Sequence, residues 1–116
     1  MNDLPISPKA GEPDRSSGPT IRQFQGLIRA RYLASDGARG SAGTFLWFTE
    51  EVGELASALA AHQPGKAPTA AHTANLAEEF ADVLAWLTTL ANIHGVDLAD
   101  ATDKYFEPGR VEGVKD

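Results

Sequence analysis

The chain has 116 residues, enough for a single domain, of which 42% are hydrophobic and 22% charged, as in ordinary globular proteins. Its net charge of -6 argues against a nucleic-acid partner, because proteins that bind the phosphate backbone present clustered Lys and Arg. It contains no cysteine, which excludes disulfides and thiolate metal sites, and no apolar run of the roughly 18 residues that a membrane span needs. We therefore expect a cytoplasmic protein without a membrane or nucleic-acid partner.

Two polar segments flank a more apolar centre. Residues 1–18 contain three of the seven prolines and few apolar groups, so they cannot bury enough surface to offset the entropy of ordering. We expect them to form a flexible tail. Residues 108–116 are again polar and contain glycine, which predicts a second tail. The folded domain is therefore expected to span residues 19–107.

Two helices are predicted in the first half of this domain. The first begins near Pro19 and Thr20, because Thr20 and Gln23 have the spacing of a capping box. The stretch SDGARGSAG, residues 35–43, contains three glycines and is expected to form a loop. The second helix is predicted over about 44–62. Its apolar stripe, the expected core face, consists of Phe45, Phe48, Val52, Leu55 and Leu59.

Two further helices are predicted after the stretch QPGKAPTA, whose prolines and glycine do not continue a helix. The third runs over about 73–94 and ends before Gly95, which fits the left-handed C-terminal position. Asp97 is the expected N-cap of a shorter fourth helix that reaches about Tyr105. Because no stretch alternates with period two, the sequence predicts an all-α four-helix bundle. The core stripe of the third helix consists of Leu76, Phe80, Val83, Leu87 and Leu90.

Four carboxylates form two matched pairs on the second and third helices. Each helical residue advances about 100° around the axis, so residues three apart are neighbours on one face. Glu51 and Glu54 form one such pair, and Glu79 and Asp82 form the other. Both pairs fall on the shoulder of the apolar stripe of their helix. On helical angle alone, Glu50 points outward.

The short connection between these helices makes them antiparallel neighbours, which brings the two acid pairs level. Trp47, one turn before the first pair, and Trp86, one turn after the second, then lie on the same side of the carboxylates. Neither helix contains Lys or Arg, so the acids would repel one another. Acids three apart on a single helix are usually a solvated face. Two matched pairs without a basic partner favour a site for Mg²⁺ or Mn²⁺ instead.

The same residues carry a family pattern. EEVGE at residues 50–54 and EFAD at residues 79–82 fit EExxE followed by ExxD. Over about residues 21–105 the chain resembles the MazG-like all-α nucleoside triphosphate pyrophosphohydrolases. The resemblance implies an enzyme that splits a nucleoside or deoxynucleoside triphosphate between its α and β phosphates, giving a monophosphate and pyrophosphate, to clear noncanonical or surplus nucleotides. It also implies a homodimer or homotetramer, whose association would complete the bundle.

The resemblance further assigns roles to single residues, with Mg²⁺ as the cofactor and Mn²⁺ as a substitute. Glu50 would orient or deprotonate the attacking water, and Lys104 would contact a phosphate. Trp47 and Trp86 could flank the base or sugar, since stacking accepts any base. The metal ligands would be Glu51, Glu54, Glu79 and Asp82. Other sources of positive charge for the phosphates are Arg29, Arg31 and Arg39.

Two alternatives stay open at this point. Phosphoribosyl-ATP pyrophosphohydrolase of histidine synthesis has a comparable acidic pattern and differs in its substrate. A non-catalytic helical dimerisation or regulatory module would show the same amphipathic stripes, although it would not need matched acid pairs. A di-iron carboxylate bundle is disfavoured, because none of the acids is followed by His at the Glu-x-x-His spacing of that class.

Overall fold

The computed structural model describes residues 17–111, and its regular elements are all helical. In chain order they are α1 (Ile21–Ala60), α2 (Ala70–Ile93), α3 (Leu98–Ala101) and the 3₁₀ helix η1 (Thr102–Tyr105). The described part of the chain has no strand, which confirms the predicted all-α class. Most of the two predicted tails, at positions 1–16 and 112–116, lies outside the described residues. Within residues 17–111, no helix combines the length and the apolar composition that crossing a membrane requires.

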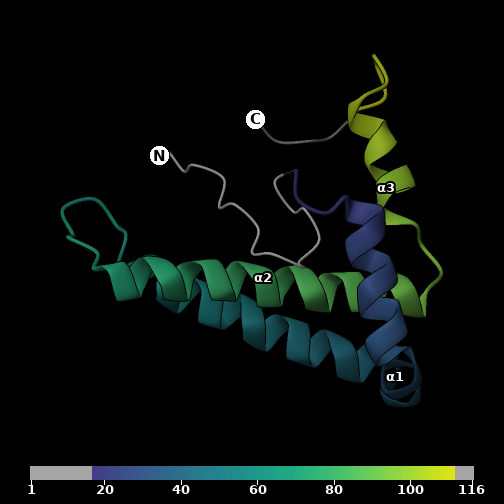
Figure 1. The fold of residues 1–116 in the computed structure, drawn as a ribbon, viewed down its shortest axis with the longest axis horizontal. Coiled ribbons are helices and arrows are strands. Elements are labelled where there is room, and N and C mark those ends of the chain that lie inside the picture. The colour runs from purple at the N-terminus through teal and green to yellow at the C-terminus, as the bar shows by residue number, and fades with distance from the viewer. Residues whose placement is uncertain (1–16, 112–116) are drawn as a thin grey trace, which may run out of the picture.

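A bend in α1 at Gly40 shapes the fold (Figure 1). Gly40 has φ 79° and ψ 175°, while the residues on either side of it are helical. Glycine reaches this backbone conformation without the clash that a Cβ atom would cause. The loop predicted over residues 35–43 is therefore wrong, because one glycine makes the turn and its neighbours stay helical. The first two predicted helices are the two arms of α1, here called the N-terminal arm (21–39) and the C-terminal arm (41–60).

The two arms pack against α2 in different ways (Figure 1). The C-terminal arm runs beside α2 in the opposite direction, and residues 61–69 connect them, as the sequence predicts. The N-terminal arm crosses the C-terminal end of α2. α3 follows and contacts α1. The predicted four-helix bundle is not formed by the single described chain, and it stays a prediction for an assembly.

The helix ends follow from local capping chemistry. The predicted capping box is present, with the Gln23 N–H donating to Thr20 Oγ1 at 3.0 Å and the Thr20 N–H donating to Gln23 Oε1 at 2.8 Å. Thr69 and His72 form a second box at the start of α2, which begins about three residues before the predicted position. Here a histidine takes the place of the usual Glu or Gln. Gly95 has the predicted positive φ, 65°.

The apolar stripe that was predicted to be the core face of the C-terminal arm is largely exposed, so that prediction is wrong for a single chain. Phe45 is 55% exposed, and Val52 and Leu59 are exposed as well. The arm instead turns Thr44, Glu51 and Ala58 towards α2, residues spaced two turns apart. Small side chains at both ends of this series let the two helices approach closely. In the described chain the buried apolar residues are Ile28, Ala58 and Ala91.

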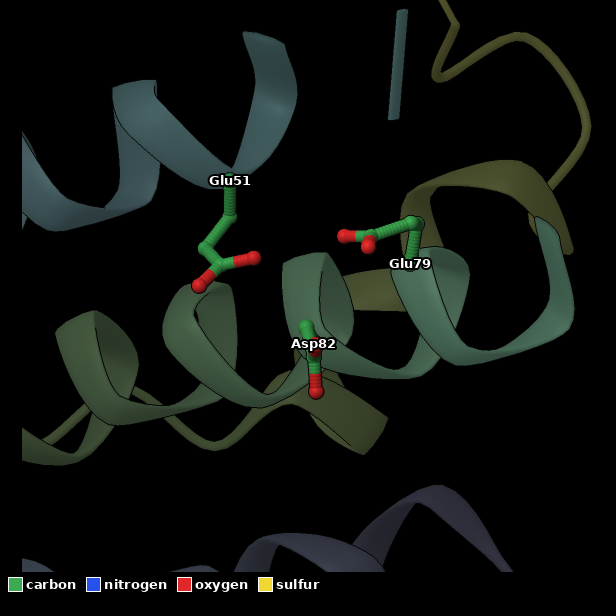
Figure 2. A group of neighbouring side chains, drawn as sticks. All are labelled: Glu51, Glu79 and Asp82. Atoms are coloured by element: carbon green, nitrogen blue, oxygen red, sulfur yellow. The ribbon is translucent and has the colours of Figure 1, made fainter. Parts of the chain in front are cut away.

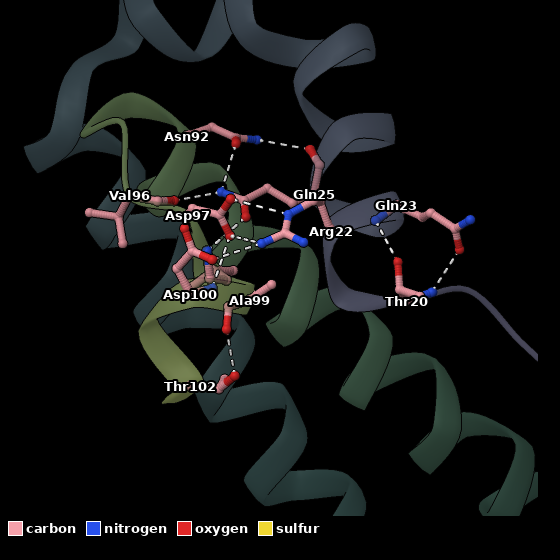
Figure 3. A network of polar contacts seen from close by, with 11 residues as sticks. Thr20, Arg22, Gln23, Gln25, Asn92, Val96, Asp97, Ala99, Asp100 and Thr102 are labelled. Atoms are coloured by element: carbon pink, nitrogen blue, oxygen red, sulfur yellow. Dashed lines mark hydrogen bonds and ion pairs between the residues drawn. The ribbon is translucent and has the colours of Figure 1, made fainter. Parts of the chain in front are cut away.

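A polar network fixes the N-terminal arm to the turn after α2 (Figure 3). Gln25 Nε2 donates to Asn92 Oδ1 at 3.1 Å and to the Val96 carbonyl at 2.7 Å. The Leu98 N–H donates to Gln25 Oε1 at 2.9 Å. Arg22 adds exposed ion pairs to two acids at the start of α3, the N-cap Asp97 at 3.3 Å and Asp100 of the first turn at 2.8 Å.

Replacing Gln25 by alanine is expected to lower the free energy of unfolding by about 2 kcal/mol, because three hydrogen bonds are lost and two of them are partly buried. The urea midpoint at one fixed protein concentration measures the change. Gln63→Ala is the matched control, since exposed Gln63 makes a single long side-chain bond of 3.4 Å, and its effect should stay within about 0.5 kcal/mol. Equal midpoints for the two variants would contradict the prediction.

Candidate functional site

Three carboxylates converge where the C-terminal arm of α1 faces α2 (Figure 2). Glu51 comes from α1, and Glu79 and Asp82 come from α2. One ligand atom from each lies within 4.8 Å of the ligand atoms of the other two. Glu51 and Glu79 are half-buried, and Asp82 is exposed. The two predicted acid pairs are therefore level, as the antiparallel arrangement requires.

The location of Glu51 differs from the shoulder position that the sequence predicts. It lies between Thr44 and Ala58 in the series that faces α2, and both of these residues are buried. A short side chain on each side leaves room for a carboxylate in the contact between the helices. Glu51 is thereby removed from much of the solvent, whereas a shoulder position would have left it hydrated.

The electrostatics of this cluster are unfavourable without a cation. Burial raises the pKa of both Glu51 and Glu79, and the neighbouring carboxylates of Glu54 and Asp82 raise it further. The Oε2 atoms of Glu51 and Glu79 are buried and accept no hydrogen bond from the described residues. In residues 17–111, none of the four acids forms an ion pair with Lys or Arg. Oxygen donors with surplus negative charge are the ligand set that Mg²⁺ and Mn²⁺ prefer.

Glu54, the fourth predicted ligand, lies at the edge of the cluster. It is exposed, and with Glu79 it lines a shallow depression on the side of the connection between α1 and α2. Its charge contributes to the raised pKa of both Glu51 and Glu79, which places it close to each of them. The fold thus brings Glu51, Glu79 and Asp82 together in one cluster, and Glu54 lies at its edge beside Glu79.

The two tryptophans meet beside the acids, as predicted. The rings of Trp47 and Trp86 stack with their centroids 6.4 Å apart and their planes 22° apart. The guanidinium of Arg39 lies 5.0 Å from the centroid of the Trp86 ring. Arg39 Nη1 also donates to Thr44 Oγ1 at 3.1 Å, across the bend at Gly40. The bend therefore places the positively charged guanidinium of Arg39 beside the aromatic pair.

A cavity of about 350 Å³ adjoins the cluster between the N-terminal arm of α1 and α2. Asp82 and Trp86 form part of its wall, so the cavity continues from the acids. The remaining wall residues are Ile28, Tyr32, Asp36, Arg39, Ala85 and Thr89. No functional role was predicted for Tyr32 or Asp36, and Asp36 falls within the loop that was predicted over residues 35–43. The spacing of Asp36 and Arg39, three apart and opposite in charge, was the one local signal that the helix continues.

Two predicted site residues lie apart from the cluster. Glu50 is exposed on the C-terminal arm, in agreement with its helical angle. Lys104 lies on η1 with its Nζ 5.1 Å from the centroid of the Tyr105 ring. Among the described residues, Lys104 forms no ion pair with a carboxylate. The roles of both residues stay predictions.

Comparison with known proteins agrees with this geometry. The family model described as the MazG nucleotide pyrophosphohydrolase domain matches residues 39–107. The match contains the four acids, both tryptophans and Arg39, and it begins at the end of the N-terminal arm. A search of curated proteins gives no match.

Proposed function

Because the chain belongs to the MazG nucleotide pyrophosphohydrolase family, we propose that it hydrolyses a nucleoside or deoxynucleoside triphosphate between the α and β phosphates. The products are a nucleoside monophosphate and pyrophosphate, and the cellular purpose is to remove noncanonical or surplus nucleotides. The observation that carries the proposal is the convergence of Glu51, Glu79 and Asp82 without a basic partner in the described chain. A helical module that only mediates association has no use for half-buried carboxylates that repel one another.

The four acids Glu51, Glu54, Glu79 and Asp82 are proposed to hold Mg²⁺, with Mn²⁺ as a substitute. The unpaired Oε2 atoms of Glu51 and Glu79 support this assignment, because a cation would relieve both their desolvation and their mutual repulsion. When bound, such an ion neutralises phosphate charge and makes a water more acidic. The chain's own contribution is to orient these oxygens on two packed helices, since phosphoryl transfer needs alignment more than covalent chemistry.

Further roles are proposed for residues around the cluster. Glu50 orients or deprotonates the attacking water, and its exposed position fits a site that a second chain covers. Trp47 and Trp86 are proposed to contact the base or sugar, which their position beside the acids supports. Lys104 is proposed as a phosphate contact. Arg39 is a further cation for this purpose, because it lines the cavity beside Asp82.

Incubation of the purified protein with a panel of triphosphates, with and without Mg²⁺, tests the proposal. We expect metal-dependent release of monophosphate and pyrophosphate, resolved by ion-exchange chromatography. Diphosphate and orthophosphate would contradict the assigned bond. Turnover of phosphoribosyl-ATP alone would favour the enzyme of histidine synthesis. Absence of turnover together with the absence of a Mg²⁺ effect on stability would favour the non-catalytic module.

A homodimer or homotetramer is proposed because the single chain leaves large apolar side chains on its long helices in solvent. Leu46 is 72% exposed, Phe80 54% and Leu84 49%. Apolar surface of this extent on both long helices is typical of an interface. We therefore expect light scattering to give two or four times the 12.3 kDa of one chain.

Leu46→Glu is expected to shift this mass towards the monomer, since it places a charge on the apolar face. Gln63→Glu is the control, because it adds the same charge at an exposed position in the connection after α1. An unchanged mass for Leu46→Glu would contradict the proposed face.

A further inference from the structure

The cavity beside the acid cluster has the size and the position of a binding site for part of a substrate. Its volume of about 350 Å³ is at the lower end of the range for small-molecule sites. Asp82 forms part of both the acid cluster and the cavity wall. If the acids hold the triphosphate through Mg²⁺, as proposed above, the nucleoside end of the substrate can enter this cavity. A role of the cavity in substrate recognition therefore rests on that proposed function.

Among the described residues, Asp36 is the wall residue with an unsatisfied hydrogen-bond acceptor. It lies on the N-terminal arm, only four residues before the bend, and is 2% exposed. Its Oδ1 accepts a bond from Arg39 Nη1 at 3.3 Å. Its Oδ2 is buried and has no hydrogen-bond partner among the described residues. A buried acceptor without a donor is unfavourable, so a ligand that supplies an N–H group at this point gains more than one that does not.

The other polar groups of the wall are less selective. The hydroxyls of Tyr32 and Thr89 can both donate and accept, so they can pair with an amino group or with a carbonyl oxygen. Arg39 can only donate. Asp36, paired with Arg39, offers acceptors alone. Since Asp82 belongs to the acid cluster, Asp36 is the wall carboxylate that is free to recognise the base.

We propose that Asp36 determines base specificity, by accepting a hydrogen bond from an exocyclic amino group of the nucleobase. Cytosine carries such a group where uracil carries a carbonyl oxygen, and adenine and hypoxanthine differ in the same way. A carbonyl oxygen against Asp36 would set two acceptors face to face and leave both unpaired. Sites built on a hydrogen bond to the substrate reject the analogue that lacks the donor more strongly than apolar pockets reject a change of size.

Binding of two analogues that differ in this group tests the proposal directly. The α,β-imido forms of dCTP and dUTP resist cleavage of the α–β bond, and quenching of Trp47 and Trp86 fluorescence in the presence of Mg²⁺ reports binding. For the unmodified protein we expect the cytosine analogue to bind about 10- to 100-fold more tightly. This comparison needs neither turnover nor a variant that folds.

The variant Asp36→Asn tests the contribution of this residue to the base preference. The amide keeps the shape of the side chain but adds an NH₂ donor that can pair with a carbonyl oxygen, so the preference should fall at least about tenfold. Asp103→Asn is the control, since it removes the same charge from an exposed position on η1 and should keep the preference. Thermal unfolding of each variant verifies that it is folded.

The outcomes separate this proposal from the proposed function. Equal affinity of the unmodified protein for the two analogues would overturn the role of Asp36 even if the triphosphate panel is hydrolysed. If neither pyrimidine analogue binds, the α,β-imido forms of dATP and dITP give the same comparison, and equal affinity or no binding there would overturn it. A cytosine preference that survives in folded Asp36→Asn would overturn it as well. A cytosine preference that Asp36→Asn removes, in a protein that hydrolyses none of the panel, would support Asp36 while the proposed function fails.

Discussion

Replacing Glu51 by glutamine is expected to lower kcat/KM by at least about 10³-fold and, at the same time, to stabilise the metal-free protein. The loss of activity follows because charge stabilisation by a bound metal is worth several kcal/mol in the transition state. The gain in stability follows because Glu51 is half-buried, its pKa is raised by burial and by Glu54 and Asp82, and its Oε2 is unpaired in the described chain. Glutamine keeps the size of the side chain and removes the repelling charge.

Initial rates and thermal unfolding in a chelator measure the two effects. Glu78→Gln is the matched control, because it makes the same chemical change at an exposed position on α2, outside the cluster. Its activity should stay within a few-fold of the unmodified protein, and its stability should change little. A Glu51→Gln variant that stays active, or that is less stable without metal, would show that Glu51 is a structural residue instead.

Removing Mg²⁺ is expected to abolish turnover and to lower the melting temperature of the unmodified protein. A ligand that binds only the folded state stabilises it by about 2.7 kcal/mol at a hundredfold excess over Kd. For a domain of this size, that corresponds to roughly 10 °C or more. Scanning calorimetry across a Mg²⁺ titration measures the shift. Glu51→Gln should show a much smaller shift at the same concentrations, and an equal shift in both proteins would place the metal elsewhere.

This Mg²⁺ effect should depend on pH in a definite direction. The pKa values of Glu51 and Glu79 are raised in the folded state, so folded protein binds more protons than unfolded protein between the ordinary value of 4.5 and the raised values. Metal-free stability therefore increases as the pH falls through that window. Protons and Mg²⁺ compete for the same oxygens, so the stabilisation by Mg²⁺ decreases over the same range.

The pKa of Asp97 is shifted in the opposite direction, so its effect on stability can be compared with that of Glu51 and Glu79 in the same protein. Its pKa is lowered by the backbone N–H of Asp100 that it caps and by the guanidinium of Arg22. Because the folded pKa lies below the ordinary value, the stability it contributes is lost only as the pH falls below 3.8. Loss of stability in strong acid and gain of stability in mild acid thus come from different residues.

Much of the acid cluster could be predicted from the sequence because it depends on helical period alone. Residues three apart share a face whatever surrounds the helix, so Glu51 with Glu54, and Glu79 with Asp82, form pairs in any α-helix. A short connection between two helices forces them to be antiparallel, which brings the pairs level. The stacking of Trp47 and Trp86 follows from the same two facts.

Tertiary structure alone decided which face meets which neighbour. Periodicity marks Phe45 and Val52 as one face of the C-terminal arm, but it cannot tell whether α2 or a second chain covers that face, and α2 packs on the face of Glu51 instead. The bend depends on the φ angle of one residue, Gly40. Nothing in the sequence distinguishes Gly40 from the neighbouring glycines as the site of a bend. That angle orients the N-terminal arm across α2 and so brings Asp36 to the wall of the cavity that also contains Asp82. These two residues lie far apart in the sequence, and a local pattern such as helical periodicity cannot predict that they meet.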